Sequence, residues 1–280
     1  MLQKSIAKFA FANAPALCDA NHHCRDYHRI WGIARLARED GSPPAGSEFF
    51  KTALGEYKAI NAAPRILVCG GADHGVLAML QQICHELALR PRFLFVDRCA
   101  TPVQANRLYA KQTGFDLVAT EADILAVDVG EVDIVVAHSL LNFLGPGDRL
   151  ALFQHWSRIL HDDGVILVSN RLTPLPEMLP TAAEEDNFSA RLAALQLAGL
   201  KLGLGPFELE ELDAAARRVW SGPISGKATF SRQELDKLVA GSGLTLAKLT
   251  EQARNRPGQK GPLAGNNPET AVRAEIVLRK

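Results

Sequence analysis

The residues with the clearest chemical meaning form a glycine-rich stretch between a short apolar run and a helical pattern: Gly70, Gly71, Ala72, Asp73, His74 and Gly75. Glycines at such a turn let the backbone approach a ligand, and a helix N-terminus offers amide donors and a partial positive charge. A second apolar run ends at Asp97, 22 residues after Gly75. A carboxylate there can accept both hydroxyls of a ribose. Together the two features predict an adenosine-containing ligand at the carboxyl ends of neighbouring strands.

The N-terminal region holds a dense group of metal-ligating residue types: Cys18, His22, His23, Cys24 and His28. On a helix, Cys24 and His28 would share a face, and zinc accepts such ligands. Structural zinc patterns draw paired ligands from two elements, however, and no second pair stands nearby in the sequence. We therefore predict no metal and a half-buried helix face. The remaining cysteines are expected to be small buried residues: Cys69, Cys84 and Cys99.

Polar and aromatic side chains outside the glycine-rich stretch are candidates for the reacting part of a site. His138 and Ser139 follow the fourth apolar run, where ligands bind in open parallel sheets. An imidazole there can take a proton from a hydroxyl, amine or thiol acceptor, and a structural hydrogen bond is the alternative role. Asn142 is a second polar candidate. One helical turn carries three further candidates, which can line a lid or pack in a core: Tyr27, His28 and Trp31.

The elements that must position these residues alternate from Pro64 onward. Apolar runs indicate strands at 65–69, 92–96, 115–119, 132–137 and 165–168, with helices at 76–89, 102–112 and 148–160 between them. Short, continuously apolar runs are typical of strands buried on both faces. Two further strands are expected at 244–250 and 271–278. The pattern predicts an α/β fold, a doubly wound, mostly parallel seven-stranded sheet with helices on both faces.

Helical additions are predicted around this alternation. We divide the chain into an N-terminal helical cap (1–60), a Rossmann-like core (61–172), a helical insertion over the site (173–227) and a closing helix with the last two strands (228–280). Ser231 and Glu234 predict a capping box at the start of that closing helix. Turn-rich stretches predict loops at 41–46, 173–180, 221–226 and 256–268, and a turn at 162–164.

Three pieces of the chain carry a family resemblance: residues 66–75, Asp97, and residues 156–169 with their helix, Asp-Asp-Gly turn and strand. They resemble the first motif, the ribose-binding acid and the fifth-strand region of the class I (Rossmann-like) S-adenosylmethionine-dependent methyltransferases. The resemblance covers residues 64–172 well and the rest, to 280, in outline. It implies S-adenosyl-L-methionine as the cofactor, with these contacts: Gly70, Gly71, Ala72, Asp73, Gly75, Asp97, Arg98, Asp123, Ile124, His138 and Ser139. Catalytic roles at the acceptor side are expected for His138, Tyr27 and His28.

The resemblance also has departures. Val68 stands where the family usually has an acidic residue, and Ala72 where it has a glycine, so the binding of the methionine end stays open. Asp73 and His74 become candidates to contact the ligand. The expected activity is methyl transfer to a small-molecule acceptor, because helices would roof the site. One alternative is another reaction of the cofactor on the same fold: cyclisation, lysis or aminocarboxypropyl transfer. A second is an NAD-dependent oxidoreductase, although the central glycine of its motif is missing here. A third is a non-catalytic scaffold that binds the cofactor.

Composition narrows the partners and the compartment. The 280 residues contain 31 Lys plus Arg and 31 Asp plus Glu, and this balance disfavours nucleic acid, whose phosphates call for a basic surface. No run of 18 apolar residues predicts a membrane span, and Lys8 interrupts a stretch that imitates a signal peptide. Five cysteines, an odd number, predict free thiols. We expect a cytoplasmic protein with a small-molecule substrate, and a homodimer stays open.

Overall fold

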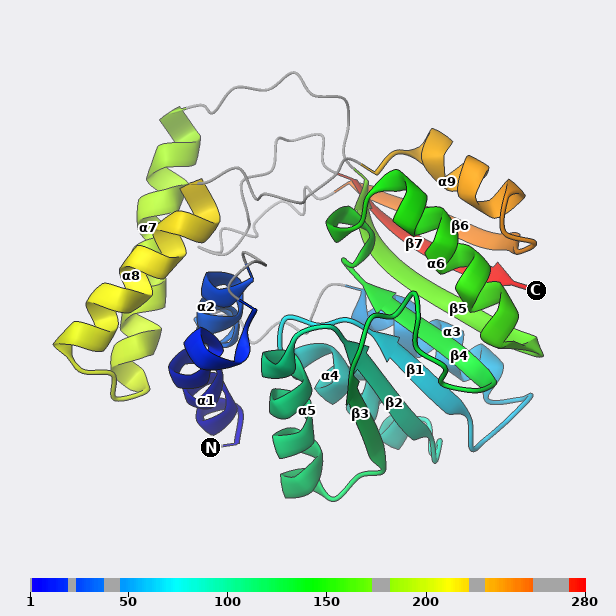
Figure 1. The fold of residues 1–280 in the computed structure, drawn as a ribbon, viewed down its shortest axis with the longest axis horizontal. Helices are drawn as coiled ribbons and strands as arrows, with labels where there is room; N and C mark the ends of the chain where they lie inside the picture. The colour runs from blue at the N-terminus through cyan, green and yellow to red at the C-terminus, as the bar shows by residue number, and fades with distance from the viewer. Residues whose placement is uncertain (1, 20–23, 38–45, 173–181, 222–229, 254–271) are drawn as a thin grey trace.

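A seven-stranded sheet forms the centre of the described structure, a computed structural model that describes residues 2–19, 24–37, 46–172, 182–221, 230–253 and 272–280 (Figure 1). The strand order is β3-β2-β1-β4-β5-β7-β6. The strands are β1 (Arg65–Cys69), β2 (Arg92–Asp97), β3 (Leu117–Glu121), β4 (Val132–His138), β5 (Leu160–Leu172), β6 (Thr245–Ala253) and β7 (Val272–Arg279). The first five are parallel, and β7 is antiparallel to both β5 and β6. The predicted fold class is confirmed.

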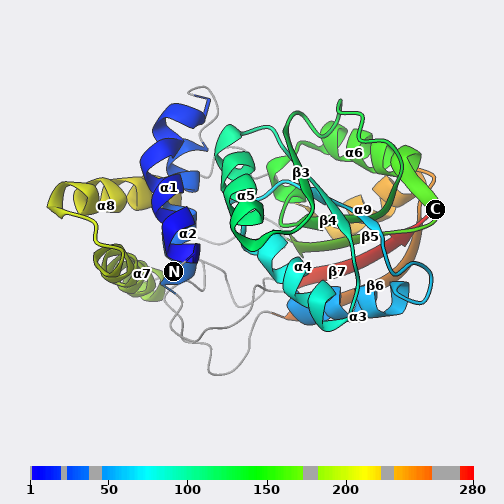
Figure 2. The same ribbon diagram turned by 90° about the horizontal axis from the view of Figure 1, so that it is seen from below.

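Helices cover both faces of this sheet (Figures 1 and 2). One face carries α3 (Ser47–Tyr57), α4 (Gly75–Glu86) and α5 (Ala100–Thr113), and the other carries α6 (Pro146–Ile159) and α9 (Arg232–Ala240). In β1, Leu67 belongs to the core beneath α6 and α9, whereas Ile66 and Val68 belong to the core beneath α3 and α4. Burial of alternate residues on opposite faces explains why the strand is continuously apolar.

A further group of helices stands at one end of the sheet (Figure 1). It comprises α1 (Leu2–Leu17), α2 (Arg25–Leu36), α7 (Ala182–Lys201) and α8 (Pro206–Ser221). Ile30 and Ile33 of α2 share an apolar core with Leu195 of α7 and Leu212 of α8. The predicted N-terminal helices and the helices after β5 therefore pack together, and α1 also packs against α5. The α3 helix, which belongs to the predicted cap segment, packs against α4. The four-segment division stays a prediction.

Several local predictions differ in detail from the structure. The β5 strand begins at Leu160, so the predicted turn at 162–164 lies within that strand, where Asp162 and Asp163 are exposed and Gly164 is buried. The Ser231 cap is confirmed, because Ser231 Oγ accepts a hydrogen bond from the Glu234 amide at 3.2 Å. His22, His23 and nearly all of the predicted loops lie outside the described residues. Within the described part of the chain, no helix combines the length and apolar character that a membrane span needs.

Candidate active site

The glycine-rich loop joins β1 to α4, and its first residue has a left-handed backbone. Gly70 has a φ of +69°, and its amide donates a hydrogen bond to the Val96 carbonyl at 2.8 Å. A Cβ atom at this position would lie 3.1 Å from Leu140 Cδ1 and 3.7 Å from Asp97 Oδ2. Glycine is therefore favoured twice, by the backbone conformation and by the close approach of Leu140.

Asp97 ends β2 directly beside this loop. Its Oδ2 accepts the Gly71 amide at 3.0 Å, and its Oδ1 accepts the Cys99 amide at 2.8 Å. Burial raises the pKa of Asp97, although the His28 charge and the two amide hydrogen bonds act in the opposite direction. A carboxylate has about four acceptor positions, so each oxygen can take one more hydrogen bond. Two ribose hydroxyls would use that remaining capacity.

The other expected cofactor contacts gather at the same edge of the sheet. The Ala122 amide donates to the Asp97 carbonyl at 3.0 Å, which places the segment after β3 against the end of β2. In that segment Asp123 is exposed, and Ile124 is half-buried against the core beneath α6. Arg98 is exposed. The structure thus brings the segment that carries Asp123 and Ile124 next to the end of β2, and their contacts with a cofactor stay a prediction.

The end of β4 contributes the next two candidates. His138 pairs in register with Ser169 of β5, and its ring centroid lies 6.4 Å from that of Phe50 in α3. Ser139 has a φ of +56°, a rare value for a residue with a side chain, and its amide donates to the Ser169 carbonyl at 2.8 Å. This left-handed turn directs the chain away from the strand immediately after His138. His138 is therefore placed at the carboxyl edge, as the sequence predicted.

Asp73 and His74 connect the loop to the N-terminal helices. Asp73 Oδ1 accepts the Gly75 amide at 2.7 Å, and Asp73 Oδ2 binds Arg35 Nε of α2 at 2.8 Å. Arg35 also lies 3.1 Å from His74 Nε2, and the His74 ring stacks on Tyr109 at 5.1 Å. Burial favours the protonated form of Asp73, but Arg35 and His74 outweigh it and lower the pKa of that carboxyl. Burial lowers the pKa of His74 to about 4. Both side chains hold α2 in place.

Aromatic side chains of α2 contact the segment that follows β4. Tyr27 stacks on Trp31 at a centroid distance of 5.1 Å, and it lies 5.8 Å from Phe143 in the short 3-10 helix η1 (Leu141–Phe143). Burial, together with the negative charges of Asp73 and Asp97, raises the pKa of Tyr27. Tyr27 is therefore close enough to both carboxylates for their negative charges to disfavour ionisation of its hydroxyl. His28, in contrast, lies among cysteine sulfur atoms, where its Nδ1 is 3.3 Å from Cys18 Sγ.

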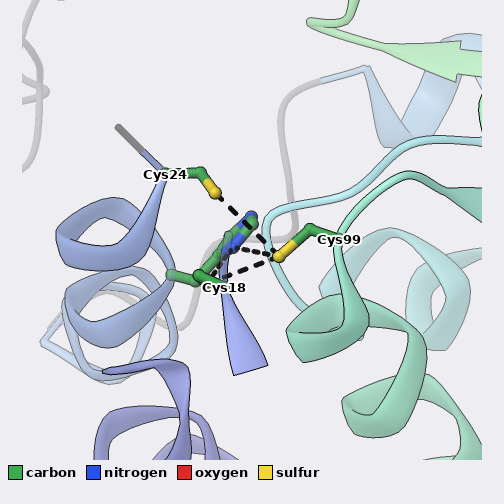
Figure 3. A group of neighbouring side chains, drawn as sticks. Cys18, Cys24 and Cys99 are labelled. Atoms are coloured by element: carbon green, nitrogen blue, oxygen red, sulfur yellow. Dashed lines mark hydrogen bonds between the residues drawn. The ribbon is translucent and has the colours of Figure 1, made fainter. Parts of the chain in front are cut away.

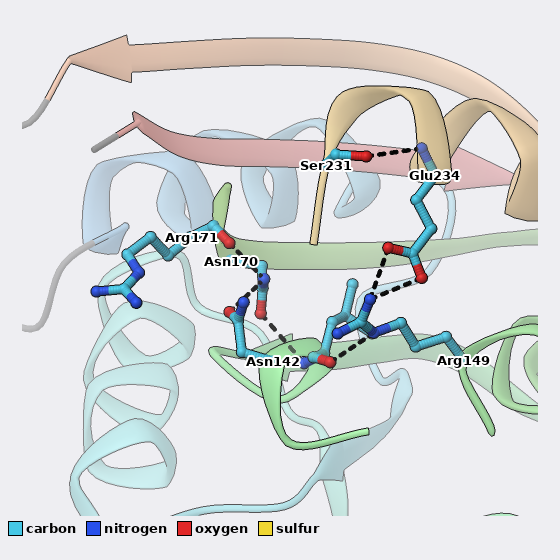
Figure 4. A network of polar contacts seen from close by, with 7 residues as sticks. Asn142, Arg149, Asn170, Arg171, Ser231 and Glu234 are labelled. Carbon is cyan, nitrogen blue, oxygen red and sulfur yellow. Dashed lines mark hydrogen bonds and ion pairs between the residues drawn. The ribbon is translucent and has the colours of Figure 1, made fainter. Parts of the chain in front are cut away.

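A buried polar network holds η1 in place (Figure 4). Asn142 Oδ1 accepts the Asn170 side-chain amide at 2.8 Å, and Arg149 Nε donates to the Leu141 carbonyl at 2.8 Å. The Arg149 side chain is fully buried, and it binds both Glu234 oxygens of α9 at 2.6 Å. Asn142, a candidate ligand contact, thus takes part in fixing the segment that carries Phe143. Sequence reasoning missed Arg149, because 85 residues separate it from Glu234.

Solved structures share this arrangement of strands and helices. Magnesium protoporphyrin IX methyltransferase from Synechocystis PCC 6803, with bound S-adenosylmethionine, superposes with a TM-score of 0.50 at 12% identity, over 95% of this chain and 99% of that one. The LepI complex with S-adenosylmethionine gives a TM-score of 0.51 at 14% identity, over 90% and 52% of the two chains. The chain has the class I S-adenosylmethionine-dependent methyltransferase fold. The recognition made from the glycine-rich loop, Asp97 and the fifth-strand region is confirmed at this level.

This fold is not restricted to one chemistry. A structure described as a pericyclic reaction enzyme also matches this chain, with a TM-score of 0.51 at 14% identity. The curated relatives are carboxy-S-adenosyl-L-methionine synthases. The Helicobacter hepaticus protein is 25% identical over 159 residues, 54% of this chain and 65% of that protein. The Vibrio campbellii protein is 32% identical over 91 residues, 32% and 35% of the two. The chain thus matches less than two thirds of either relative, and no family model matches it.

Proposed function

We propose that the protein binds S-adenosyl-L-methionine at the carboxyl edge of β1, β2 and β4. The observation that carries this proposal is the Asp97 carboxylate, which lies beside the glycine-rich loop and retains two acceptor positions after it has accepted the Gly71 and Cys99 amides. The likeness to structures that hold this cofactor supports it. The adenosine would contact Gly70, Gly71, Ala72, Asp97, Arg98, Asp123 and Ile124, with Ser139 and His138 toward the sulfonium. Gly75 and Asp73, also expected contacts, would position α2, because Arg35 already occupies Asp73.

The proposed reaction is methyl transfer to a small-molecule acceptor. The acceptor lone pair attacks the methyl carbon, the carbon–sulfur bond breaks with its electrons going to sulfur, and S-adenosylhomocysteine remains. Such an in-line displacement depends mainly on holding the acceptor near attack distance. Tyr27, Trp31 and Phe143 would provide that positioning and exclude water, since the Tyr27 ring contacts both of the other rings. His138 would take the acceptor proton.

A second candidate is modification of the cofactor itself without methyl transfer. It is favoured by the curated relatives, which by their names make carboxy-S-adenosyl-L-methionine. A small-molecule substrate would occupy the same roofed position in both cases. We also propose a cytoplasmic location without a nucleic-acid partner, since the formal net charge is zero and the five cysteines form no disulfide.

Mass spectrometry of the ligand and product separates these candidates. The protein would first be analysed under native conditions for a bound nucleoside, and then incubated with S-adenosyl-L-methionine and a small-molecule extract. S-adenosylhomocysteine that forms together with a methylated acceptor supports methyl transfer, whereas carboxy-S-adenosyl-L-methionine or methylthioadenosine supports the second candidate. Binding of NAD in preference to S-adenosyl-L-methionine would refute the proposed cofactor.

A further inference from the structure

Cys18, Cys24 and Cys99 converge on one another (Figure 3), and His28 belongs to the same cluster. Cys18 directly follows α1, Cys24 caps the N-terminus of α2, His28 lies in the first turn of α2, and Cys99 caps the N-terminus of α5. Their ligand atoms all lie within 4.8 Å of one another. The sequence argument against a metal rested on the lack of further ligands near the N-terminal cluster. The fold supplies one in Cys99, which is 81 residues from Cys18.

The spacing of these atoms fits one tetrahedral ion. Cys99 Sγ lies 3.4 Å from Cys18 Sγ and 4.0 Å from Cys24 Sγ, and His28 Nδ1 lies 3.3 Å from the Sγ atoms of both Cys18 and Cys99. Zinc bonds of about 2.3 Å to sulfur and about 2.0 Å to nitrogen give tetrahedral edges of about 3.8 Å and about 3.5 Å. An iron–sulfur cluster would hold the thiolates further apart, because several inorganic atoms stand between them. We infer that Cys18, Cys24, His28 and Cys99 bind a single structural zinc ion.

Ordinary core packing explains the cluster less well. The other two cysteines, Cys69 and Cys84, are also buried, but they are separated within the apolar cores of the sheet. In the cluster, a buried imidazole instead directs its Nδ1 toward two sulfur atoms, which are weak hydrogen-bond partners. Three thiols and one imidazole are a complete ligand set for structural zinc.

Two of the ligands stand at helix N-termini, Cys24 at that of α2 and Cys99 at that of α5. A helix N-terminus carries a partial positive charge, which favours a negatively charged, metal-bound sulfur. Thr101 Oγ1 lies 3.1 Å from Cys18 Sγ, where a hydroxyl can donate to a metal-bound sulfur. A cavity of about 290 Å³ borders the cluster and is lined in part by Cys18, Cys24 and Cys99, which gives an ion a path of entry.

The position of the cluster indicates what the ion would do. The four ligands fill the tetrahedral set, so the site has no open position for a substrate and is structural. It would join α1 and α2 to the start of α5. The Cys99 amide is also one of the two donors that hold Asp97, so the ion would fix the ribose-binding carboxylate and the helix that carries Tyr27 together.

Metal content of the full-length protein tests this inference. Protein expressed with zinc and purified under reducing conditions without chelators should contain about one zinc ion per chain. Cys18→Ser and Cys99→Ser should lose it, and the matched control Cys84→Ser should retain it. Cobalt added to the chelator-treated protein should give the visible spectrum of a tetrahedral thiolate site. Wild-type protein without zinc and without that cobalt spectrum would overturn the inference, as would full zinc content in both cluster variants.

Two further measurements keep the test decisive if the serine variants fail to fold. His28→Cys should retain zinc and give a cobalt spectrum with stronger sulfur-to-metal absorption. In the wild-type protein, zinc should protect Cys18, Cys24 and Cys99 from alkylation, and chelator treatment should expose them. Equal alkylation with and without the chelator contradicts the inference. A protein mass that is lower by two hydrogen atoms would also contradict the inference, because it would show a disulfide instead of a metal site.

Discussion

Arg35 of α2 donates from Nε to Asp73 Oδ2 at 2.8 Å, so one ion pair joins the N-terminal helices to the glycine-rich loop. The two side chains are 16% and 6% exposed, which places the pair largely out of solvent. The other Asp73 oxygen accepts the Gly75 amide. A change in the loop therefore reaches the helix that carries Tyr27 and Trp31, and the proposed cofactor site and its roof are structurally coupled.

A double-mutant cycle should detect this coupling. Arg35→Met and Asp73→Asn should each destabilise the protein by about 1.5–3 kcal/mol, since each leaves a buried charge or polar group without its ionic partner. The double variant should lose clearly less than the sum of the two. Urea denaturation of the four proteins measures the coupling. The exposed pair Arg217–Asp213 is the control and should show almost none, whereas additive losses at Arg35 and Asp73 would contradict the prediction.

Substitution of Gly70 should abolish cofactor binding because the new Cβ atom would crowd Leu140 and Asp97, and not because of backbone strain. Gly70→Ala introduces a side chain in the left-handed region and places its Cβ 3.1 Å from Leu140. Gly114, at the end of α5, has a similar φ of +72°, but a Cβ atom there would meet no described atom within 4 Å, so Gly114→Ala carries the strain alone. Both variants should lose about 1–2 kcal/mol of stability. Calorimetric titration with S-adenosyl-L-methionine should show loss of binding only in Gly70→Ala, and equal affinity in both would contradict the prediction.

Asp97 should make cofactor binding pH-dependent. Only the carboxylate can accept two ribose hydroxyls while it also accepts the Gly71 and Cys99 amides. Because burial raises its pKa, affinity should begin to fall on acidification at a pH above that of an ordinary aspartate. Asp97→Asn should weaken binding by roughly 10- to 150-fold at neutral pH and flatten that dependence. Asp116→Asn, at the opposite edge of the sheet, should match wild type, and unchanged affinity in Asp97→Asn would refute the assignment.

The contrast between Asp97 and Cys99 shows how far sequence reasoning reaches. The sheet and Asp97 could be predicted, because buried parallel strands leave continuous apolar runs, and their carboxyl ends meet at one edge. The contacts made by Arg35, Cys99 and Arg149 could not. These contacts depend on how helices that are distant in sequence pack against the sheet. Local hydrophobic periodicity predicts a helix or a strand, but it does not predict which distant residue that element will contact.

Tyr27 and His138 should affect turnover in different ways. Loss of a general base typically costs about 10²- to 10⁴-fold, so His138→Ala should lower the rate and remove the acidic limb of its pH profile. Tyr27→Ala should lower the rate without changing the shape of that profile, because it removes a ring that positions the acceptor. The rate of S-adenosylhomocysteine formation across pH distinguishes them. An unchanged profile in His138→Ala would assign this histidine a structural role.

His74 should make the protein less stable in mild acid. Burial lowers the pKa of His74 to about 4 in the native state, whereas in the unfolded chain it returns to 6.5. Between those values the unfolded chain binds a proton that the native protein does not, so stability falls as the pH drops through this window. The shift from 6.5 to about 4 corresponds to about 3–4 kcal/mol. His74→Gln should lower stability at neutral pH through the lost Tyr109 contact, but its free energy of unfolding should vary less between about pH 7 and about pH 4.5. Urea denaturation at a series of pH values measures both slopes. Parallel curves for the two proteins would show that His74 titrates normally and that the junction between the loop and α2 is open to water.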